Sequence, residues 1–579
     1  MAREINSRLR IEGKLIAETP LHVGGYGESF ETDLALAKNG RDEFYIPGTS
    51  LTGVLRSWFE KAFPGEADSV WGFQVGDQGH ASFVLIEDLT LPEQVQSELR
   101  DGVGIDRHYG TAAEGAKFDR AILPRGTVLD FVMMIEMQND TAKIKARFGY
   151  LLEALKNGEI RLGASKTRGL GKVKLQNIKI REDKFIGFDI LEILKAKEET
   201  KEEQEKRFTD FDAFKIELQK VAKGETKSNY DKFKPNPSEQ IAIAIDWKPK
   251  SPLMVKAGYE GIGVDTLPLV SINGKGKVSL CLPGSSVKGA FRAHAERILR
   301  TVFDFNAPTN SNKSDNFSNQ LQMFDQNDKP TKATQLIGEI FGAKKEREEK
   351  DKPNQSKSTL GLGALSIDDC YTKEGFSMKA DNWQKVETGK VTKTVPAGNN
   401  KTKEEEVSYS EQELWKAIKA VEEDSDLTSS TKNFHIAHHT AIDRFTGAAA
   451  ETALYSVLKP TAEIRWENLC LTLDFNRLYP KDADESAKQK QRRIALMLLL
   501  LVLRDFAENR LPLGFATTRG MGEVKDVSFE IKGAYNISYR DGQFNFKDDE
   551  KTEDESQKLK NKIQKEWDKW RTESQTSNS

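Results

Sequence analysis

Apolar and polar residues alternate in two segments of the chain as they do in β-strands. The segment IAIAIDW at 241–247 alternates strictly, and RLRIEGKLIA at 8–17 does so less cleanly. A period of two places one side of each strand in a core. Both segments run into a Pro-Leu pair, Pro20-Leu21 or Pro252-Leu253, which is typical of a turn. The pattern therefore predicts the same strand and turn twice.

Each turn is followed by a Pro-Gly loop and a segment with helical periodicity. The loops read IPGTS at 46–50 and LPGSS at 282–286. One face of each predicted helix is apolar. These faces consist of Leu51, Val54, Leu55, Trp58 and Phe59 in the first helix, and of Val287, Ala290, Phe291, His294 and Ala295 in the second. We expect Ser50 and Ser286 to be the N-caps. Two further helices are predicted at 146–158 and 494–506.

The two halves of the chain match beyond these elements. The motif Ile-Asp-Arg at 105–107 returns at 442–444, and LGASKTRGLGKVK at 162–174 returns as LGFATTRGMGEVK at 513–525. The offset is 232 residues at the Pro-Leu turns (20 against 252), 337 at the Ile-Asp-Arg motifs (106 against 443) and 351 at the glycine-rich loops (163 against 514). The chain is therefore an internal duplication whose second copy carries insertions.

The duplication predicts two α+β domains joined by a linker. The expected boundaries are a first domain at 1–190, a charged linker at 191–238, a second domain at 239–545 and a charged tail at 546–579. Insertions near 306–335 and 371–432 are rich in Asn, Ser, Lys, Thr and Glu, which predicts mobile surface loops.

Composition narrows the class of protein. A chain of 579 residues is too long for one ordinary core, and 31% of its residues are charged. The apolar run at 494–503 is about half the length that a membrane-spanning helix needs, and no export signal follows the start. We therefore expect a cytoplasmic protein without a membrane partner. Three widely separated cysteines argue against a disulfide framework and a cysteine zinc site.

The net charge of −3 does not indicate a nucleic-acid-binding protein, so any binding of phosphates must rest on local loops. A loop that opens a helix offers free amides to an anion, and successive amides in a glycine-rich turn can do the same. Either feature alone is more often structural. Repeated twice and paired, the loops suit a polyanion that is held at regular intervals. Their candidate residues are Gly48, Thr49, Ser50, Gly284, Ser285, Ser286, Lys166, Arg168, Gly169, Gly171, Thr518, Arg519, Gly520 and Gly522.

These motifs together resemble the RAMP superfamily, which forms the backbone of type III CRISPR effector complexes. The resemblance rests on Pro-Leu-His-Val-Gly-Gly at 20–25, Ile-Pro-Gly-Thr-Ser-Leu at 46–51 with Gly53 and Arg56, the Ile-Asp-Arg motifs and the glycine-rich loops. It implies two tandem ferredoxin-like (RRM-like, βαββαβ) domains, each with a thumb β-hairpin and a glycine-rich loop. A fusion of two such units is similar to the fused subunits of subtype III-D. The further RNA-binding residues that the resemblance implies are His22, Arg56, Lys288 and Arg292.

The resemblance also implies two catalytic aspartates. In target-cleaving members, an aspartate follows the Pro-Leu turn, and Asp33 and Asp265 occupy that place with the same offset of 232 residues as the turns. RNA supplies its own nucleophile, the 2′-OH. One carboxylate that binds a divalent cation, Mg²⁺ or else Mn²⁺, or that takes the proton, is then sufficient. Without the resemblance, an aspartate in a loop is more simply a turn former.

Two other groups of polar residues have simpler interpretations. Asp106-Arg107 and Asp443-Arg444 are expected to pin the bases of the thumb hairpins, and to contact RNA only secondarily. Phe118 and Tyr455 follow them and could stack on a base. The sequence HIAHH at 435–439 would be split between the two faces of a strand, so RNA contact or plain surface histidines are favoured over a zinc site.

The sequence leaves two functions open. The first is a metal-dependent endoribonuclease that holds guide RNA and cuts the paired target RNA beside other RAMP-type subunits and the large subunit of the complex. The second is a scaffold in which the aspartates only form turns. A third, more remote function is the trimming of guide precursors with a histidine base, for which His22 exists only in the first copy. The copies also differ around the turn, where the second has Met254 and Lys256-Ala257 in place of His22 and Gly24-Gly25.

Overall fold

The structure is a computed structural model of the whole chain. It describes all residues except 1–4, 26–31, 92–94, 108, 139–140, 186–204, 222–225, 259–260, 273–276, 305–322, 324–330, 344–360, 374–377, 397–401, 409, 424–432, 452, 479–483, 547–552 and 577–579. The described residues form a mixed α+β protein, which confirms the predicted class. No helix among them is long and apolar enough to cross a membrane.

The chain divides into two compact units. Unit 1 comprises Met1–Leu99, Arg120–Lys166 and Leu170–Ser238, and unit 2 comprises Arg100–Asp119, Thr167–Gly169 and Glu239–Ser579. The main division lies between the two copies of the sequence. Two short segments of the first copy nevertheless belong to unit 2, and no pattern in the sequence indicates this.

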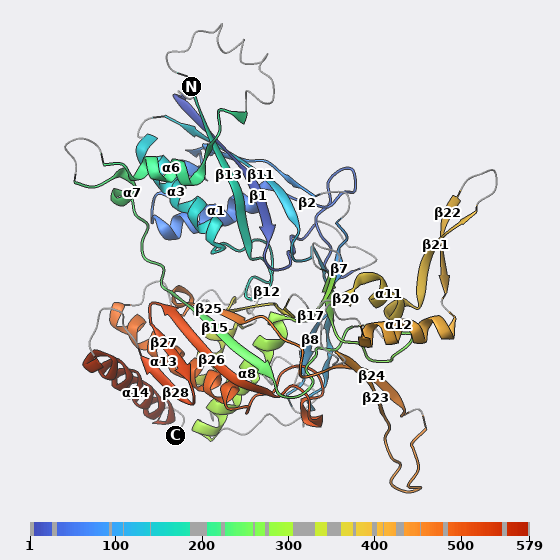
Figure 1. The fold of residues 1–579 in the computed structure, drawn as a ribbon. Coiled ribbons are helices and arrows are strands. Elements are labelled where there is room, and N and C mark those ends of the chain that lie inside the picture. The colour runs from blue at the N-terminus through green and yellow to red at the C-terminus, as the bar shows by residue number, and fades with distance from the viewer. Residues whose placement is uncertain are drawn as a thin grey trace. The chain divides into compact units, whose positions relative to one another are not determined.

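Unit 1 is built on a five-stranded antiparallel sheet of order β14-β13-β1-β11-β5 (Figure 1). The strands are β1 (Ser7–Ala17), β5 (Val84–Ile86), β11 (Val128–Met137), β13 (Val173–Lys184) and β14 (Thr209–Asp210). Helix α1 (Gly48–Ala62) lies between β1 and β5 in the chain, and α3 (Thr141–Asn157) lies between β11 and β13. Alternate residues of β1 are buried in one core with Phe59 of α1 and Phe148 of α3, whose rings are 5.5 Å apart.

The described part of the expected linker is packed into unit 1. Helix α6 (Phe211–Gln219) buries Phe211 and Phe214 in the core, and Tyr230 of α7 (Asn229–Lys232) stacks on Tyr150 at 3.9 Å. The remaining short elements of this unit are α2 (Ala67–Trp71), β2 (Tyr45–Ile46), β3 (Phe73–Val75), β4 (Gln78–His80), β6 (Leu89–Thr90), β7 (Glu98–Leu99) and β10 (Ala121–Ile122).

Unit 2 has a seven-stranded sheet of order β12-β18-β25-β15-β26-β27-β28. The strands are β12 (Arg168–Gly169), β15 (Gln240–Pro249), β18 (Leu365–Asp368), β25 (Leu469–Asp474), β26 (Val524–Gly533), β27 (Ile537–Arg540) and β28 (Gln543–Phe546). Helix α8 (Gly284–Phe303) precedes β18 in the chain, and α13 (Glu485–Ala507) connects β25 to β26. The order of strands and helices from β15 to β26 therefore repeats that of unit 1 from β1 to β13.

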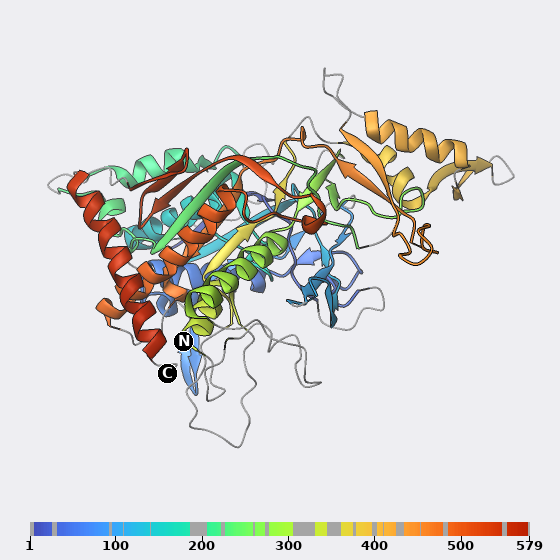
Figure 2. The ribbon, with the colours of Figure 1, turned by 90° about the horizontal axis from the view of Figure 1, so that it is seen from below.

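The charged tail contains helix α14 (Glu553–Thr576), which lies along α13 and α8 (Figures 1 and 2). Its buried residues Ile563, Trp567 and Trp570 join the core of unit 2, and Trp570 meets Phe303 of α8 edge-on at 5.4 Å. The outer side of α14 is thus charged, and its inner side packs into the core of unit 2.

The second insertion is folded, so the expectation of mobile loops was wrong for this segment. It contains β19 (Cys370–Tyr371), β20 (Met378–Lys379), α11 (Ala380–Thr388), the hairpin of β21 (Lys390–Pro396) and β22 (Thr402–Ser408), and α12 (Glu411–Glu423). Trp383, Val386, Ala417, Ile418 and Val421 are buried in the core of unit 2. These apolar residues recur at helical spacing, although the insertion as a whole is polar. The first insertion lies almost entirely outside the described residues, apart from its end in α10 (Lys332–Phe341).

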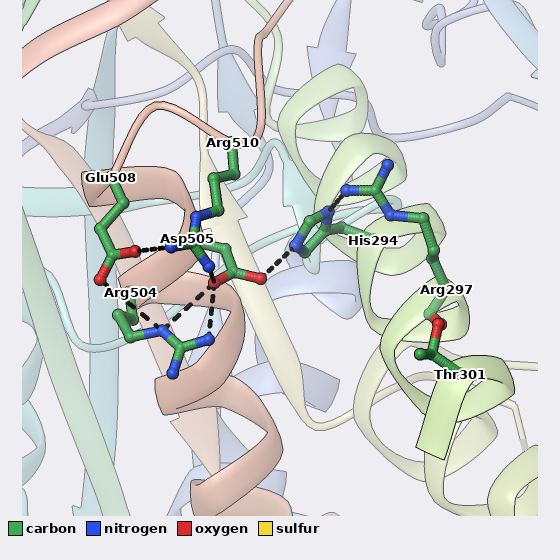
Figure 3. Close-up of polar contacts among 7 residues, drawn as sticks. All are labelled: His294, Arg297, Thr301, Arg504, Asp505, Glu508 and Arg510. Atoms are coloured by element: carbon green, nitrogen blue, oxygen red, sulfur yellow. Dashed lines mark hydrogen bonds and ion pairs between the residues drawn. The ribbon is translucent and has the colours of Figure 1, made fainter. Parts of the chain in front are cut away.

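A polar network joins the two main helices of unit 2 (Figure 3). His294 of α8 shares a hydrogen bond of 2.8 Å between its Nε2 and Oδ2 of Asp505 of α13, and Arg297 donates to His294 Nδ1 at 2.8 Å. Arg504 and Arg510 also pair with Asp505. Because Arg297 donates to Nδ1, the ring is neutral and donates through Nε2. Burial, together with Arg297, lowers the pKa of His294.

Candidate functional site

The carboxylate of Asp265 is exposed and held in place by one residue. Its Oδ2 accepts hydrogen bonds from the backbone amide of Ser456 at 2.6 Å and from the Ser456 hydroxyl at 2.7 Å. The Asp265 amide donates in turn to the Ser456 hydroxyl at 3.0 Å. These bonds from Ser456 lower the pKa of Asp265, so the carboxylate is ionised at neutral pH. The sequence analysis missed Ser456, which lies 191 residues away in the chain.

Ser456 belongs to a hairpin of β23 (Phe434–His439) and β24 (Tyr455–Pro460). In this hairpin His438 is paired with Ser456, and His439 with Tyr455. Alternation therefore puts His438 on the face of Ser456, where its charge acts on Asp265, and His435 and His439 on the opposite face. The predicted split of the three histidines between two faces is confirmed.

Asp33 is also exposed, and its surroundings in unit 1 resemble those of Asp265. Leu34 forms a parallel bridge with Arg120, as Thr266 does with Val457. The amide of Ala121 donates to the Leu34 carbonyl at 3.0 Å, as that of Leu458 does to Thr266. The offset of 337 residues gives Ser456 an aspartate, Asp119, as its sequence counterpart. Glu28, Glu31 and Glu260, which are close to the two aspartates in the sequence, lie outside the described residues.

The two helices that follow the Pro-Gly loops are capped by distant aspartates. Helices α1 and α8 begin at Gly48 and Gly284 after N-cap prolines, whose side chains make no cap hydrogen bond, so the prediction for Ser50 and Ser286 was wrong. The Gly48 amide donates to Asp88 at 2.7 Å, and the Gly284 amide donates to Asp369 at 2.8 Å. Each aspartate thus takes one of the amides that were expected to hold an anion.

The exposed residues of these helix starts are Thr49 and Ser285, whereas Lys288 is buried. Lys288 Nζ donates to the Leu365 carbonyl at 2.6 Å, and burial, together with Arg168 and Arg292, lowers its pKa to about 7. Within unit 2, β12 runs parallel to β18. Gly169 lies so near the start of α8 that a Cβ on it would be 3.0 Å from the Gly284 nitrogen. The start of α8 is therefore covered by part of the first glycine-rich loop.

The glycine-rich loops have matching glycines in both copies, although Arg168–Gly169 is a strand and Thr517–Arg519 is a 3-10 helix. Gly169, Gly171, Gly520 and Gly522 all have positive φ, which confirms the expected use of glycine. A side chain at Gly171 or Gly522 would also collide with the carbonyl of Leu162 or Leu513. The amides of Gly171 and Gly522 donate to the carbonyls of Pro20 and Pro252, so they stabilise the Pro-Leu turns. Of the candidate residues at these loops, Arg168, Thr518, Arg519 and Gly520 are exposed.

Three further residues that the resemblance implies for RNA binding have protein partners. His22 is buried, its ring Nδ1 is 2.7 Å from the Ala121 carbonyl, and burial lowers its pKa. Arg56 pairs with Asp68 at 2.5 Å. Arg292 donates to Glu296 and to the Gly342 carbonyl, each at 2.8 Å. Lys166 is half-buried.

The aspartates of the two Ile-Asp-Arg motifs form turns at the tips of the hairpins, and not at their bases as predicted. Asp106 accepts from the Tyr109 amide between β8 (Gly102–Ile105) and β9 (Ala112–Phe118). Asp443 accepts from the amides of Phe445 and Thr446. A carboxylate that accepts amides two or three residues ahead closes a turn. Arg107 pairs with Glu296 at 3.0 Å, and Arg444 is exposed.

The described residues contain no cluster of three or more histidine, cysteine, aspartate or glutamate side chains that could hold a metal ion. Counted over the described residues alone, the metal that the resemblance implies would have one protein carboxylate at each aspartate. Asp265 fits this arrangement, because Ser456 binds its Oδ2 and, within the described part of the chain, no other residue donates a hydrogen bond to its Oδ1. Mg²⁺ in proteins often keeps several waters and binds one or two carboxylates together with substrate phosphates.

Comparison with known proteins identifies the family. The profile described as "RAMP superfamily" matches residues 14–174 and 246–525, one region in each copy and more than half of the chain in total. The chain belongs to the RAMP superfamily. The family that the motifs indicate is thereby confirmed. The CRISPR system Cms endoribonuclease Csm3 of Methanocaldococcus jannaschii is 25% identical to this RAMP protein over 205 residues, which cover 30% of this chain and 82% of the relative.

Proposed function

We propose that this RAMP protein is a backbone subunit of a type III CRISPR effector complex, in which two tandem ferredoxin-like units hold guide RNA and cleave the paired target RNA. The observation that carries the proposal is the carboxylate of Asp265, ionised and exposed at the place where target-cleaving relatives have an aspartate. The same sequence position in the first copy is Asp33. The name of the related endoribonuclease and the two family matches support this function.

The reaction needs few protein groups. The 2′-OH of the target attacks the adjacent phosphorus, the bond from phosphorus to O5′ breaks, and a 2′,3′-cyclic phosphate and a free 5′-OH remain. The proton of the 2′-OH leaves and a proton is delivered to O5′. An ionised carboxylate accepts a proton or orients a water that does so, provided that the nucleotide is held in line. Ser456 fixes the direction of the Asp265 carboxylate.

Asp33 and Asp265 would each hold one divalent cation, Mg²⁺ or Mn²⁺. When bound, this ion stabilises negative charge on the phosphate and lowers the pKa of a bound water. The exposed cations and amides at Arg168, Arg519 and Gly520 would bind the sugar-phosphate backbone. Sequence specificity then comes from base pairing between guide and target. In the complex, other RAMP-type subunits and the large subunit are the proposed protein partners.

The test is cleavage of an end-labelled target RNA by the complex reconstituted with guide RNA and Mg²⁺. The variants are Asp33→Asn, Asp265→Asn and the double variant. Asp77→Asn is the matched control, since Asp77 is an exposed aspartate in the β3–β4 turn. We expect each single variant to lose one product by at least about a hundredfold, with guide binding unchanged.

The alternative function is a scaffold that binds guide RNA without cutting. An unchanged set of products in the double variant would establish that function and would move the nuclease to another subunit. The same cleavage is repeated with EDTA in place of Mg²⁺. If the products still form, the aspartates act as proton acceptors and do not bind a metal.

A further inference from the structure

His438 is a titratable side chain on the face of the β23–β24 hairpin that carries Ser456. It is exposed, and it is paired across the hairpin with Ser456, the residue that holds Asp265. The structure gives its ring no hydrogen-bond partner among the residues that it describes. The turns and helix caps described above do not use this histidine, so its role is open.

The backbone bonds of Ser456 determine how close His438 lies to it. The Ser456 amide donates to the Asp265 carboxylate, and the Ser456 carbonyl accepts from the Thr266 amide at 3.0 Å. Both groups therefore point away from β23, and His438 and Ser456 are a pair without backbone hydrogen bonds between them. In such a pair the Cα atoms are only about 4.5 Å apart, and the two side chains are neighbours on one face.

Asp265, Ser456 and His438 lie side by side on three neighbouring segments. Thr266 forms a parallel bridge with Val457 on one side of β24, and β23 is paired with β24 on its other side. Because neighbouring segments are about 4.8 Å apart, the Cα atoms of Asp265 and His438 are about 10 Å apart. After the bonds from Ser456, the charge of His438 also lowers the pKa of Asp265. The carboxylate and the imidazole therefore flank a space in which a phosphate group fits.

The cleavage reaction needs a second proton transfer besides the one at the 2′-OH. When the bond from phosphorus to O5′ breaks, O5′ must receive a proton, because an alkoxide is a poor leaving group. In an in-line displacement the attacking and the leaving oxygen lie on opposite sides of phosphorus, so the base and the acid must flank the phosphate. An ionised carboxylate suits the first role, and a histidine suits the second near neutral pH.

The first copy has no histidine at the corresponding position. The offset of 337 residues assigns Asp101 to His438, as it assigns Asp119 to Ser456. Asp101 forms an ion pair with Lys117 at 3.3 Å, so the first copy has an anion where the second has an imidazole. The histidine next to the serine is therefore specific to the second copy.

We infer that His438 is the catalytic acid of the Asp265 site and donates a proton to the O5′ leaving group of the target RNA. Asp265, or a water that it orients, accepts the proton of the 2′-OH as this oxygen bonds to phosphorus. The bond from phosphorus to O5′ breaks, and O5′ takes the proton of the imidazolium. Exchange with water then returns a proton to His438 and removes one from Asp265. The inference rests on the proposed function, to which it adds the proton donor.

The test uses target RNA in which sulfur replaces O5′ at one cleavage site at a time. A thiol is far more acidic than an alcohol, so the sulfur leaves without a proton, and a protein that lacks only the acid cuts this RNA normally. The variants, in the complex reconstituted with guide RNA and Mg²⁺, are His438→Gln and Asp265→Asn. His435→Gln is the matched control, because His435 is exposed on the opposite face of β23. Guide binding and the melting temperature verify that each variant folds and assembles.

Rates are measured in single turnovers with the oxygen and the sulfur RNA. We expect His438→Gln to form the Asp265-dependent product at least about a hundredfold more slowly from the oxygen RNA, and at the wild-type rate from the sulfur RNA. Asp265→Asn should be slow on both RNAs, because the 2′-OH still needs a base. His435→Gln should keep the wild-type ratio of the two rates. The Asp33-dependent product should be unaffected by His438→Gln.

A wild-type rate of His438→Gln on the oxygen RNA would overturn the inference. An equal loss on both RNAs would also overturn it and would assign the histidine to binding or positioning. Either result leaves the proposed function intact as long as Asp265→Asn loses its product. If Asp265→Asn keeps every product, the proposed function fails by itself. A loss in His438→Gln that sulfur restores would then retain His438 as the acid beside a different base.

Discussion

At the scale of single residues, the most informative contact is that between Asp265 and Ser456. Two donors on one carboxylate oxygen, Oδ2, favour the ionised form of Asp265 and fix its side chain. In the first copy, the sequence counterpart of Ser456 is Asp119, which has no hydroxyl group to donate the same hydrogen bond. At the position of Ser456, the sequence of the first copy therefore has an acid in place of a hydroxyl donor.

Replacement of Ser456 by alanine should change the pH dependence of one product only. Ser456→Ala removes the hydroxyl donor, so the pKa of Asp265 rises toward its ordinary value. Cleavage that needs the carboxylate falls as pH drops through this pKa, and the acidic limb of the profile therefore moves to higher pH. We expect about tenfold slower cleavage at neutral pH as well, from poorer positioning. The measurement is a pH–rate profile of the Asp265-dependent product.

Two controls accompany this prediction. The Asp33-dependent product in the same reaction should keep its profile, and Ser456→Thr should restore the original limb because it retains the hydroxyl. An acidic limb at the same pH in wild type and Ser456→Ala would show that Ser456 does not act through Asp265.

The buried pair of His294 and Asp505 predicts a pH effect on stability. Burial and Arg297 lower the pKa of His294 below its ordinary value of 6.5. Its contribution to stability is therefore fully present above about pH 6.5 and is lost as pH falls through the lower pKa of the folded state. The urea midpoint of the wild type should decrease between pH 7.5 and 5.5 more than that of His294→Gln. Equal decreases would show that other groups cause the effect.

Sequence reasoning selected Asp265 as a candidate but did not indicate Ser456 as its partner, and the reason is physical. The aspartate follows a turn at a constant local offset, whereas the bond to Ser456 depends on how β24 lies beside residue 266. The same holds for Asp88 and Asp369, which cap helices far away in the chain. Local signals such as the positive φ of Gly171 and Gly522 were predictable because they depend on residue type alone.

At the scale of elements, composition was a poorer guide than periodicity. The tail and the second insertion are polar on average, and the insertion was expected to form mobile loops. Ile563, Trp567 and Trp570 nevertheless share one side of α14, and Trp383 and Val386 one side of α11, all of them buried. A few apolar residues at helical spacing suffice to dock a charged helix. The strands and helices of the duplicated core were predictable because both copies show the same periods.

The packing of α14 predicts a large effect of one substitution. Trp567→Ala removes a side chain that is 4% exposed, so we expect the free energy of unfolding of unit 2 to fall by about 3–5 kcal/mol. Lys565→Ala, at an exposed position two residues earlier, should change it by less than about 0.5 kcal/mol. Chemical denaturation followed by tryptophan fluorescence measures both, with far-UV circular dichroism as the second probe. Similar midpoints for the two variants would mean that α14 does not stabilise the unit.

The insertion predicts an effect on the Asp265 site. Ile418 and Leu414 of α12 lie against Gly263, two residues before Asp265, close enough that a Cβ there would stand 3.0 Å from Ile418. Ile418→Ala leaves a cavity under this loop, and we expect about tenfold slower formation of the Asp265-dependent product, with the Asp33-dependent product unchanged. The exposed neighbour Lys419→Ala is the control. Equal loss of both products would indicate a general loss of assembly.

At the scale of the whole molecule, the compact units do not coincide with the sequence copies. Residues 100–119 come from the first copy but belong to unit 2. Within that unit, Arg100 donates to Asp369 at 2.7 Å, and both side chains are buried. Asp369 also accepts from the Gly284 amide at the start of α8. A residue of the first copy therefore neutralises the carboxylate that caps the main helix of the second.

The buried pair of Arg100 and Asp369 predicts which elements exchange amide hydrogens faster when Arg100 is replaced. Arg100→Met leaves the Asp369 carboxylate buried without its cation, which costs about 3–5 kcal/mol, and the cost falls on unit 2 because α8 depends on that carboxylate. Hydrogen exchange should therefore accelerate in α8 and β18 but not in β1 and β11. In the double variant Arg100→Met/Asp369→Asn the buried charge is gone while an oxygen remains for the Gly284 amide, so exchange in α8 should slow again. Acceleration confined to unit 1, or no recovery in the double variant, would show that the pair does not connect the first sequence copy to the stability of the second.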